Sequence, residues 1–176
     1  MLTVQFTNPP EDIQSALASL SAIATPAFAV KTVATSLTDL IKLGFNDGEE
    51  PWGAPWAKPK YRPGQPLRDT GRLMNSIGFE MTGDEALVGT NVCYGMVHQF
   101  GAHIVAGKPS GNQVCGYKPK GAALLRWAVG GKWYSAKEVT IPARPFLPIR
   151  NSQVDLPVAW VEDILDALVA EFESIQ

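Results

Sequence analysis

The stretch IPARPFLP, residues 141–148, places three prolines within eight positions. Proline fixes φ at about −65° and lacks a backbone N–H, so this stretch cannot be the interior of a helix or of a central strand. Ile141, Phe146 and Leu147 are nevertheless apolar, and burying a side chain of this kind contributes about 1.5–3 kcal/mol. We therefore predict a stiff, extended segment, the proline arm, that docks against the rest of the fold or against another subunit.

The proline arm carries one charged residue, Arg144, directly before Pro145. Because the flanking prolines already order the backbone, little entropy is lost when the guanidinium forms a bidentate contact. One interpretation is a salt bridge inside the fold that pins the arm. The other is a contact across a subunit boundary, and the residues alone leave both open.

The composition is typical of one globular domain with an interacting surface. A chain of 176 residues most often forms a single domain. We expect one domain over residues 1–176, with extended loops at 46–65 and 107–121. Charged residues make up 18% of the chain, below the typical quarter, and the chain has five tryptophans. These values favour a surface that partners cover in part.

Charge and hydrophobic runs argue against two classes of partner. A formal net charge of −2 gives no long-range attraction to DNA or RNA, so specific nucleic-acid binding is not expected. No run approaches the roughly 18–20 apolar residues of a membrane span, and no basic residue precedes Lys31, so no signal peptide is predicted. Cys93 and Cys115 are too few for a secreted disulfide framework. A reduced cytosolic origin is the default interpretation, while a single bridge stays open.

The first quarter of the chain has helical periodicity. Residues 2–6 alternate apolar and polar, which is typical of a short strand. Asn8 is placed to cap a helix that ends or kinks at Pro26. A second apolar rhythm follows over residues 30–44, where Gly44 is the predicted C-cap.

The middle of the chain shows hairpin signals. One hairpin is predicted over residues 78–90, with its turn at Gly83-Asp84. A second is predicted from strands 124–129 and 132–139, which flank Gly130-Gly131, and its downstream strand leads into the proline arm.

Three further helices complete the predicted elements. One is short, capped by Asp69 or Thr70 and reaching Ile77; the next covers residues 94–101; the last is an amphipathic helix over residues 158–172. The resulting fold class is α+β. It has an antiparallel β-sheet with hairpins packed against N-terminal helices and a C-terminal helix, and an extended proline-rich arm.

The loop over residues 46–65 carries Trp52, Trp56 and Tyr61 among basic residues. Loops longer than about 12–15 residues are usually functional or disordered. Aromatic side chains beside lysines can stack on single-stranded nucleic acid, but the negative net charge favours a protein contact. We expect this loop to order on contact with a partner.

Groups with reactive chemistry are few. Cys93 and His98 lie more than a helical turn apart, and no acidic residue stands nearby in the sequence to orient the imidazole. Adding His103 and Cys115 gives enough ligands for a metal, but their spacing matches none of the close pairs typical of zinc. No paired carboxylates and no phosphate-binding glycine loop stand out. We therefore predict no enzyme activity, no metal and no cofactor.

Three separated motifs resemble those of the phage virion morphogenesis, or tail completion, proteins. LRDTGRLMNSI at residues 67–77 resembles the family's L-x-D-T-G-x-L-x-x-S-I box. VGT at 88–90, followed by YGMVHQFG at 94–101, is similar to V-G-T … Y-A-x-x-H-Q-F-G, with Gly95 in place of the usual alanine. IPARPFL at 141–147 matches the third box, and order and spacing agree over residues 67–150.

The resemblance implies a structural protein in the neck of a tailed phage or prophage, distantly related to tail terminators. Such proteins complete the tail tube as an oligomeric ring, expected to be a hexamer, and join tail to head. The implied partners are further copies of the chain, the tail tube protein, a head–tail connector or stopper protein and, in a contractile tail, the sheath or a sheath-terminating protein. The protein would be made in the host cytoplasm and reside in the virion tail or neck, with DNA passing through the ring lumen.

The rival interpretations are another neck component, such as a connector adaptor or stopper, a minor virion protein, or an enzyme of unrecognised type.

A closed ring needs two different surfaces on each subunit, and pre-ordered segments lower the cost of association. We therefore expect Arg144→Ala or Phe146→Ala to weaken ring assembly or tail attachment while leaving the monomer folded. The candidate subunit or partner contacts are Arg144, Phe146, Leu147, Trp52, Trp56, Tyr61, Arg72, His98, Gln99 and Phe100.

Overall fold

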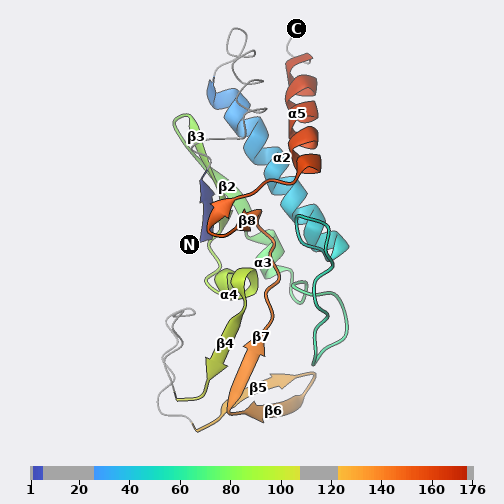
Figure 1. Cartoon of the computed structure of the whole chain (residues 1–176), viewed down its shortest axis with the longest axis vertical. Helices are drawn as coiled ribbons and strands as arrows, with labels where there is room; N and C mark the ends of the chain where they lie inside the picture. The colour runs from blue at the N-terminus through green and yellow to red at the C-terminus, as the bar shows by residue number, and fades with distance from the viewer. Residues whose placement is uncertain (1, 6–25, 108–122, 174–176) are drawn as a thin grey trace.

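The computed structural model describes residues 2–5, 26–107 and 123–173, and Figure 1 shows an elongated molecule. Two long helices and a three-stranded sheet form one end, two short helices lie in the middle, and two of the three two-stranded ladders form the other end. Every strand pairing is antiparallel. The α+β class predicted from the sequence is confirmed, but within the described residues the strands divide into four small sheets instead of one.

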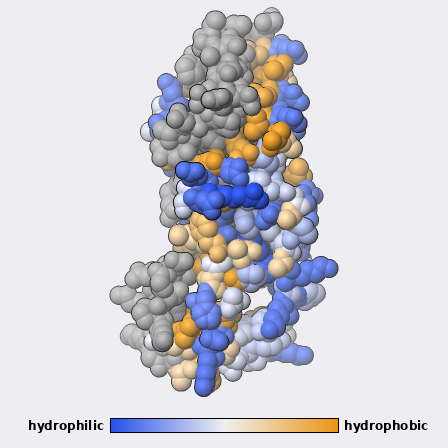
Figure 2. Space-filling model, in the orientation of Figure 1, coloured by the Kyte–Doolittle hydropathy of each residue, from blue (hydrophilic) through white to orange (hydrophobic). Residues whose placement is uncertain are grey.

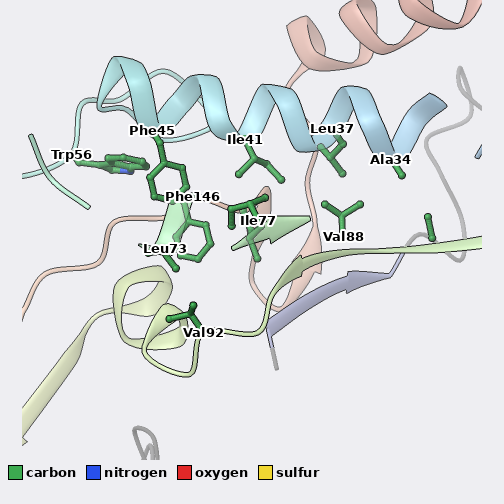
Figure 3. Packing of buried hydrophobic residues seen from close by; sticks show 12 residues of the cluster. Ala34, Leu37, Ile41, Phe45, Trp56, Leu73, Ile77, Val88, Val92 and Phe146 are labelled. Carbon is green, nitrogen blue, oxygen red and sulfur yellow. The ribbon is translucent and has the colours of Figure 1, made fainter. Parts of the chain in front are cut away.

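Helix α2 (Pro26–Asp47) lies between the sheet and helix α5 (Val158–Glu173). Residues three or four apart share a helix face, and α2 uses two such faces. Figure 3 shows Ala34, Leu37, Ile41 and Phe45 pointing from α2 into the main core. Ala29 and Val33 pack instead with Ile164 and Leu168 of α5.

The prediction that the second helix ends at Gly44 is wrong, because α2 continues to Asp47. The residue that ends it is Gly48, whose φ is +81° and whose N–H donates to the Gly44 carbonyl at 2.8 Å. The extra turn places Phe45 in the core. An apolar residue directly after Gly44 is the sequence signal that favours continuation of the helix past that glycine. The first predicted helix, from Asn8, lies outside the described residues.

The main sheet has the order β1-β3-β2, from strands β1 (Leu2–Gln5), β2 (Ile77–Thr82) and β3 (Glu85–Thr90). The predicted first hairpin is confirmed, with its turn at Gly83-Asp84 and Phe79 opposite Val88. The N-terminal strand is also confirmed and pairs with β3. Val88 and Ile77 are buried under α2, so this sheet and α2 enclose the main core.

Two short helices join this core to the other end of the molecule. Helix α4 (Gly95–Phe100) agrees with the predicted helix that ends at Gly101. Helix α3 (Arg72–Asn75) is shorter than predicted, because Ile77 already belongs to β2. Gly71, with φ +74°, occupies its N-cap without a side-chain cap bond.

At the far end, β4 (Ala102–Val105) pairs with β7 (Glu138–Ile141), and β5 (Leu125–Val129) pairs with β6 (Lys132–Ala136). The predicted second hairpin around Gly130-Gly131 is therefore confirmed. Its downstream strand was predicted to run unbroken to Val139, which is wrong. The chain changes partner after β6, so that β7 leads into the proline arm. A short ladder of β8 (Ile149–Arg150) and β9 (Gln153–Val154) follows the arm.

Helix α5 confirms the predicted C-terminal helix and buries Ile164, Leu168 and Phe172. Val158, expected on the buried face, is exposed. Within the described ranges, no helix combines the length and the apolar character that crossing a bilayer requires.

Candidate functional site

The three motif segments meet around the proline arm. The Arg144 N–H donates to the His98 carbonyl of α4 at 2.7 Å, which joins the arm to the end of that helix. Leu73 of α3 lies in the same core cluster as Phe146 and Leu147. Segments that are up to eighty residues apart in the sequence thus build one junction between the two ends of the molecule.

Gln99 holds the arm through its side-chain amide. Its Oε1 accepts hydrogen bonds from the backbone N–H groups of Phe146 at 2.9 Å and Leu147 at 3.0 Å. Its Nε2 donates to the Leu147 carbonyl at 3.0 Å. Gln99 is only 2% exposed. Buried backbone groups need hydrogen-bond partners. Because the prolines prevent the arm from pairing as a strand, the Gln99 side-chain amide supplies these partners instead.

Aromatic side chains cover the other side of the arm. Trp56 Nε1 donates to the Pro145 carbonyl at 2.8 Å. The Phe45 ring lies 5.4 Å from the Trp56 ring and 5.5 Å from the Phe146 ring, centroid to centroid. Figure 3 shows these three rings as one continuous group below α2. Phe146, at 1% exposure, is therefore a core residue of its own chain.

Hydroxyl groups connect α3 with β3 beside the arm. Ser76 Oγ donates to the Leu73 carbonyl at 2.7 Å and lies 2.6 Å from Thr90 Oγ1, which accepts from the Val92 N–H at 3.1 Å. The serine of the first motif and the threonine of the second therefore have a structural role.

Gly101 lets the backbone pass close to the arm. Its φ of +73° and ψ of 170° belong to a region of backbone conformation that residues other than glycine rarely adopt. A Cβ at this position would lie 2.9 Å from Ala143 N and 2.9 Å from the Ile141 carbonyl oxygen. Both atoms are backbone, so neither can rotate away.

We expect Gly101→Ala to lower the free energy of unfolding by at least about 2 kcal/mol, because backbone strain and overlap add. Urea denaturation followed by circular dichroism measures this. The matched control is Gly78→Ala, where an added Cβ meets nothing within 4 Å and φ is not positive. This control should be neutral or stabilising by under about 1 kcal/mol. Equal stabilities for wild type and Gly101→Ala would contradict the assignment.

Arg144 is 8% exposed and donates from Nε to the Ala57 carbonyl at 2.8 Å. The arm is thus pinned within the subunit by a hydrogen bond to a carbonyl, not by the salt bridge that one sequence interpretation proposed. Burial lowers the pKa of the guanidinium, and the charge of Arg62 lowers it further. In the described parts of the chain, the two terminal nitrogens have no ion-pair partner. Weaker assembly of Arg144→Ala therefore stays a prediction.

His98 is largely buried beside Arg144. Its ring meets Tyr94 edge-on at 5.8 Å, and its Nδ1 is buried without a hydrogen-bond partner among the described residues. Burial lowers the pKa of His98, and the positive charge of Arg144 lowers it further. Both causes favour the neutral imidazole.

This pKa shift predicts an acid-sensitive fold. Below the ordinary histidine pKa of 6.5 the unfolded chain takes up a proton that the native imidazole resists, so the free energy of unfolding declines as the pH falls from that value toward the lowered pKa of His98. We expect the free energy of unfolding to decline between pH 7.5 and 5.5, and His98→Gln to flatten this slope. His103→Gln, at an exposed position, is the control. An unchanged slope in His98→Gln would refute the role of His98.

The ten candidate contact residues divide by exposure. Tyr61, Arg72 and Phe100 are exposed, and Trp52 and His98 are intermediate, with the Arg150 guanidinium 3.7 Å from the Trp52 ring centre. The other five are buried: Trp56, Gln99, Arg144, Phe146 and Leu147.

The burial of Phe146 argues against one expectation. Because the ring fills the core of its own chain, we expect Phe146→Ala to destabilise the monomer itself. Sequence reasoning also missed Phe45, which joins Trp56 and Phe146, and Thr90, which joins α3 and β3. The apolar i, i+4 step from Ile41 is the signal that could have found Phe45.

The groups considered for chemistry are not arranged for it. Cys93 is disulfide-bonded, so it is not a free thiol nucleophile. In the regions that the structure describes, no three histidine, cysteine or acidic side chains gather to hold a metal ion. His103 bonds Thr140 and Glu138 across the β4–β7 ladder, away from His98.

Comparison with known proteins gives two matches. The model of the phage virion morphogenesis family matches residues 10–170, which include all three converging segments. Over 167 residues the chain is 34% identical to the Mu-like prophage FluMu G protein 2 of Haemophilus influenzae, covering 94% of this chain and 95% of that protein. No solved structure matches the chain.

Proposed function

Because the chain belongs to the phage virion morphogenesis family, we propose that it is a structural protein of the phage neck that completes the tail tube and joins tail to head. The observation that carries the proposal is the match over residues 10–170, in which the family motifs form the junction around the proline arm. Those motifs hold a rigid scaffold together. A scaffold of this kind suits a protein whose surfaces, not a catalytic group, perform the function.

The proposed form is a closed ring, expected to be a hexamer, because a tube end presents a rotationally symmetric surface and heterologous contacts close into rings. One face of the ring would contact the tail tube protein, and the other a head–tail connector or stopper protein. In a contractile tail the sheath, or a sheath-terminating protein, would be a further neighbour. DNA would pass through the lumen without being read in sequence.

The proposal is tested in the phage that encodes the chain. After deletion of the gene, we expect electron micrographs of lysates to show filled heads and tails that remain separate. Adding the purified wild-type chain should restore joined particles, while Gly101→Ala protein, weakened at the junction, should restore fewer. Joined, infectious particles without the chain would refute the proposal. Joined particles that lack only DNA would place the chain elsewhere in morphogenesis.

A further inference from the structure

The β5–β6 hairpin projects at the end of the molecule opposite α5 (Figure 1). A two-stranded hairpin is rarely stable alone, and here the loop before α3 supports it. The Tyr61 ring lies 5.5 Å from Trp127 and 4.9 Å from Tyr134, while Trp127 and Tyr134 stack at 5.9 Å. Tyr61, from the loop over residues 46–65, therefore helps to hold the hairpin in place.

The opposite face of the hairpin is open. Trp133 pairs with Ala128, one position from the Trp127–Tyr134 pair, so its side chain leaves the other face of the ladder. Trp133 is 77% exposed, beside a tight turn at Gly130-Gly131 where both φ values are positive. Exposed tryptophans of this kind are frequent anchors of protein interfaces.

The hairpin and the loop segment that packs on it are basic, and the acidic Glu138 follows on β7. Residues 57–62 and 125–137 contain basic residues and no acidic ones. All of these basic side chains except Arg62 are exposed. The full set of basic residues is Lys58, Lys60, Arg62, Arg126, Lys132 and Lys137.

Helix α5, at the other end, is uniformly acidic. It has five acidic residues and no basic one. At about 100° per residue, one outer stripe of α5 combines two exposed valines with three acids: Val158, Glu162, Asp166, Val169 and Glu173. These three acids have no ion-pair partner within the described ranges. Figure 2 shows apolar and strongly hydrophilic atoms side by side in this upper part of the molecule.

We propose that the basic hairpin end of one subunit docks on the acidic stripe of α5 in a second copy of this chain. This inference rests on the ring proposed above and adds the two surfaces through which its subunits meet. A chain of net charge −2 whose ends carry opposite charge is complementary to itself. Two different surfaces at opposite ends make a heterologous contact, the kind that closes into a ring. Trp133 packs against the valines, Arg126 on the same face of the ladder meets the acids, and Lys132 beside the turn adds positive charge.

The test is charge reversal on the full chain, read by native mass spectrometry and sedimentation. The hairpin variant carries Arg126→Glu and Lys132→Glu; the helix variant carries Glu162→Lys and Asp166→Lys. Each variant alone brings like charges together, and we expect at least a tenfold weaker assembly. Mixing the two variants in equal amounts should restore rings that alternate both proteins, because each interface again pairs opposite charges. Trp133→Ser should weaken assembly without changing the melting temperature.

The matched control is Lys31→Glu with Arg68→Glu, which makes the same change in charge at exposed residues outside both surfaces. It should assemble like wild type. If the hairpin variant assembles like wild type, this inference is overturned, but the proposal that the chain forms a ring is not. Wild-type assembly combined with lost binding to tail tubes or to DNA would assign the hairpin to that partner instead. A wild-type chain that never assembles would overturn the ring itself.

Discussion

Replacing Phe146 with alanine is expected to lower the free energy of unfolding by about 3–5 kcal/mol, the usual cost of deleting a buried phenylalanine ring. The ring contacts Phe45, 5.5 Å away between centroids, and lies in the cluster that joins α2, the main sheet and the proline arm. The cavity would open between these segments, and the prolines of the arm prevent its backbone from closing it. Little relaxation is available to reduce the cost.

Chemical denaturation at neutral pH measures this loss, and Phe100→Ala is the matched control. Phe100 belongs to the neighbouring motif but is 49% exposed, so its replacement should change stability by less than about 1 kcal/mol. If the two variants lost similar amounts, Phe146 would not occupy the core. A folded Phe146→Ala monomer that only fails to assemble would restore the interpretation drawn from the sequence.

Replacing Gln99 with methionine is expected to cost about 2–6 kcal/mol. Methionine nearly preserves the volume, but it leaves the buried N–H groups of Phe146 and Leu147 without partners, at about 1–3 kcal/mol each. The Leu147 carbonyl keeps a hydrogen bond from the Ile149 N–H at 2.7 Å. Both effects act on the same arm, so this substitution and Phe146→Ala should not be additive when combined.

Hydrogen exchange distinguishes this mechanism from general destabilisation. In the Gln99→Met protein the Phe146 and Leu147 amides should lose protection more than the β2–β3 ladder does. Gln153→Met, at an exposed position of β9, makes the same chemical change and should leave exchange unaltered. Full protection of both arm amides in Gln99→Met would show that Gln99 does not hold the arm.

Local sequence patterns predicted the elements of this fold well. The Gly83-Asp84 and Gly130-Gly131 turns, the helix ending at Gly101 and the C-terminal amphipathic helix each depend on neighbouring residues, and all four are present. The errors lie where tertiary contacts override local preference. Gly44 fails to end α2 because Phe45 gains a core position, and the strand after Gly131 breaks because β7 pairs with β4.

The sequence predicted which residues belong to the candidate site, but not whether their side chains are buried or exposed. The motifs identified Gln99, Arg144 and Phe146, but no local pattern shows whether such residues face inward or toward a partner. Their burial follows from pairings between distant segments: Gln99 with Leu147, Trp56 with Pro145, and Arg144 with Ala57. Partner surfaces are therefore better sought on the exposed hairpin and on α5 than in the motifs themselves.

This arrangement, with a buried junction and separate exposed surfaces, suits the ring proposed above. The junction around the proline arm fixes the hairpin end relative to α5, because β7 of the far end continues directly into the arm. Surfaces at the two ends are then presented in a defined relation. A ring closes at one number of subunits only when that relation is rigid.

The most direct test is the native mass of the purified wild-type chain in solution. We expect a closed oligomer of fixed size, with six times the mass of the 19.0 kDa chain. The proportion of this oligomer should fall as the salt concentration rises, because the docking charges are screened. A mass that stays at 19.0 kDa at every protein and salt concentration, with the fold intact, would show that the chain does not form a ring by itself.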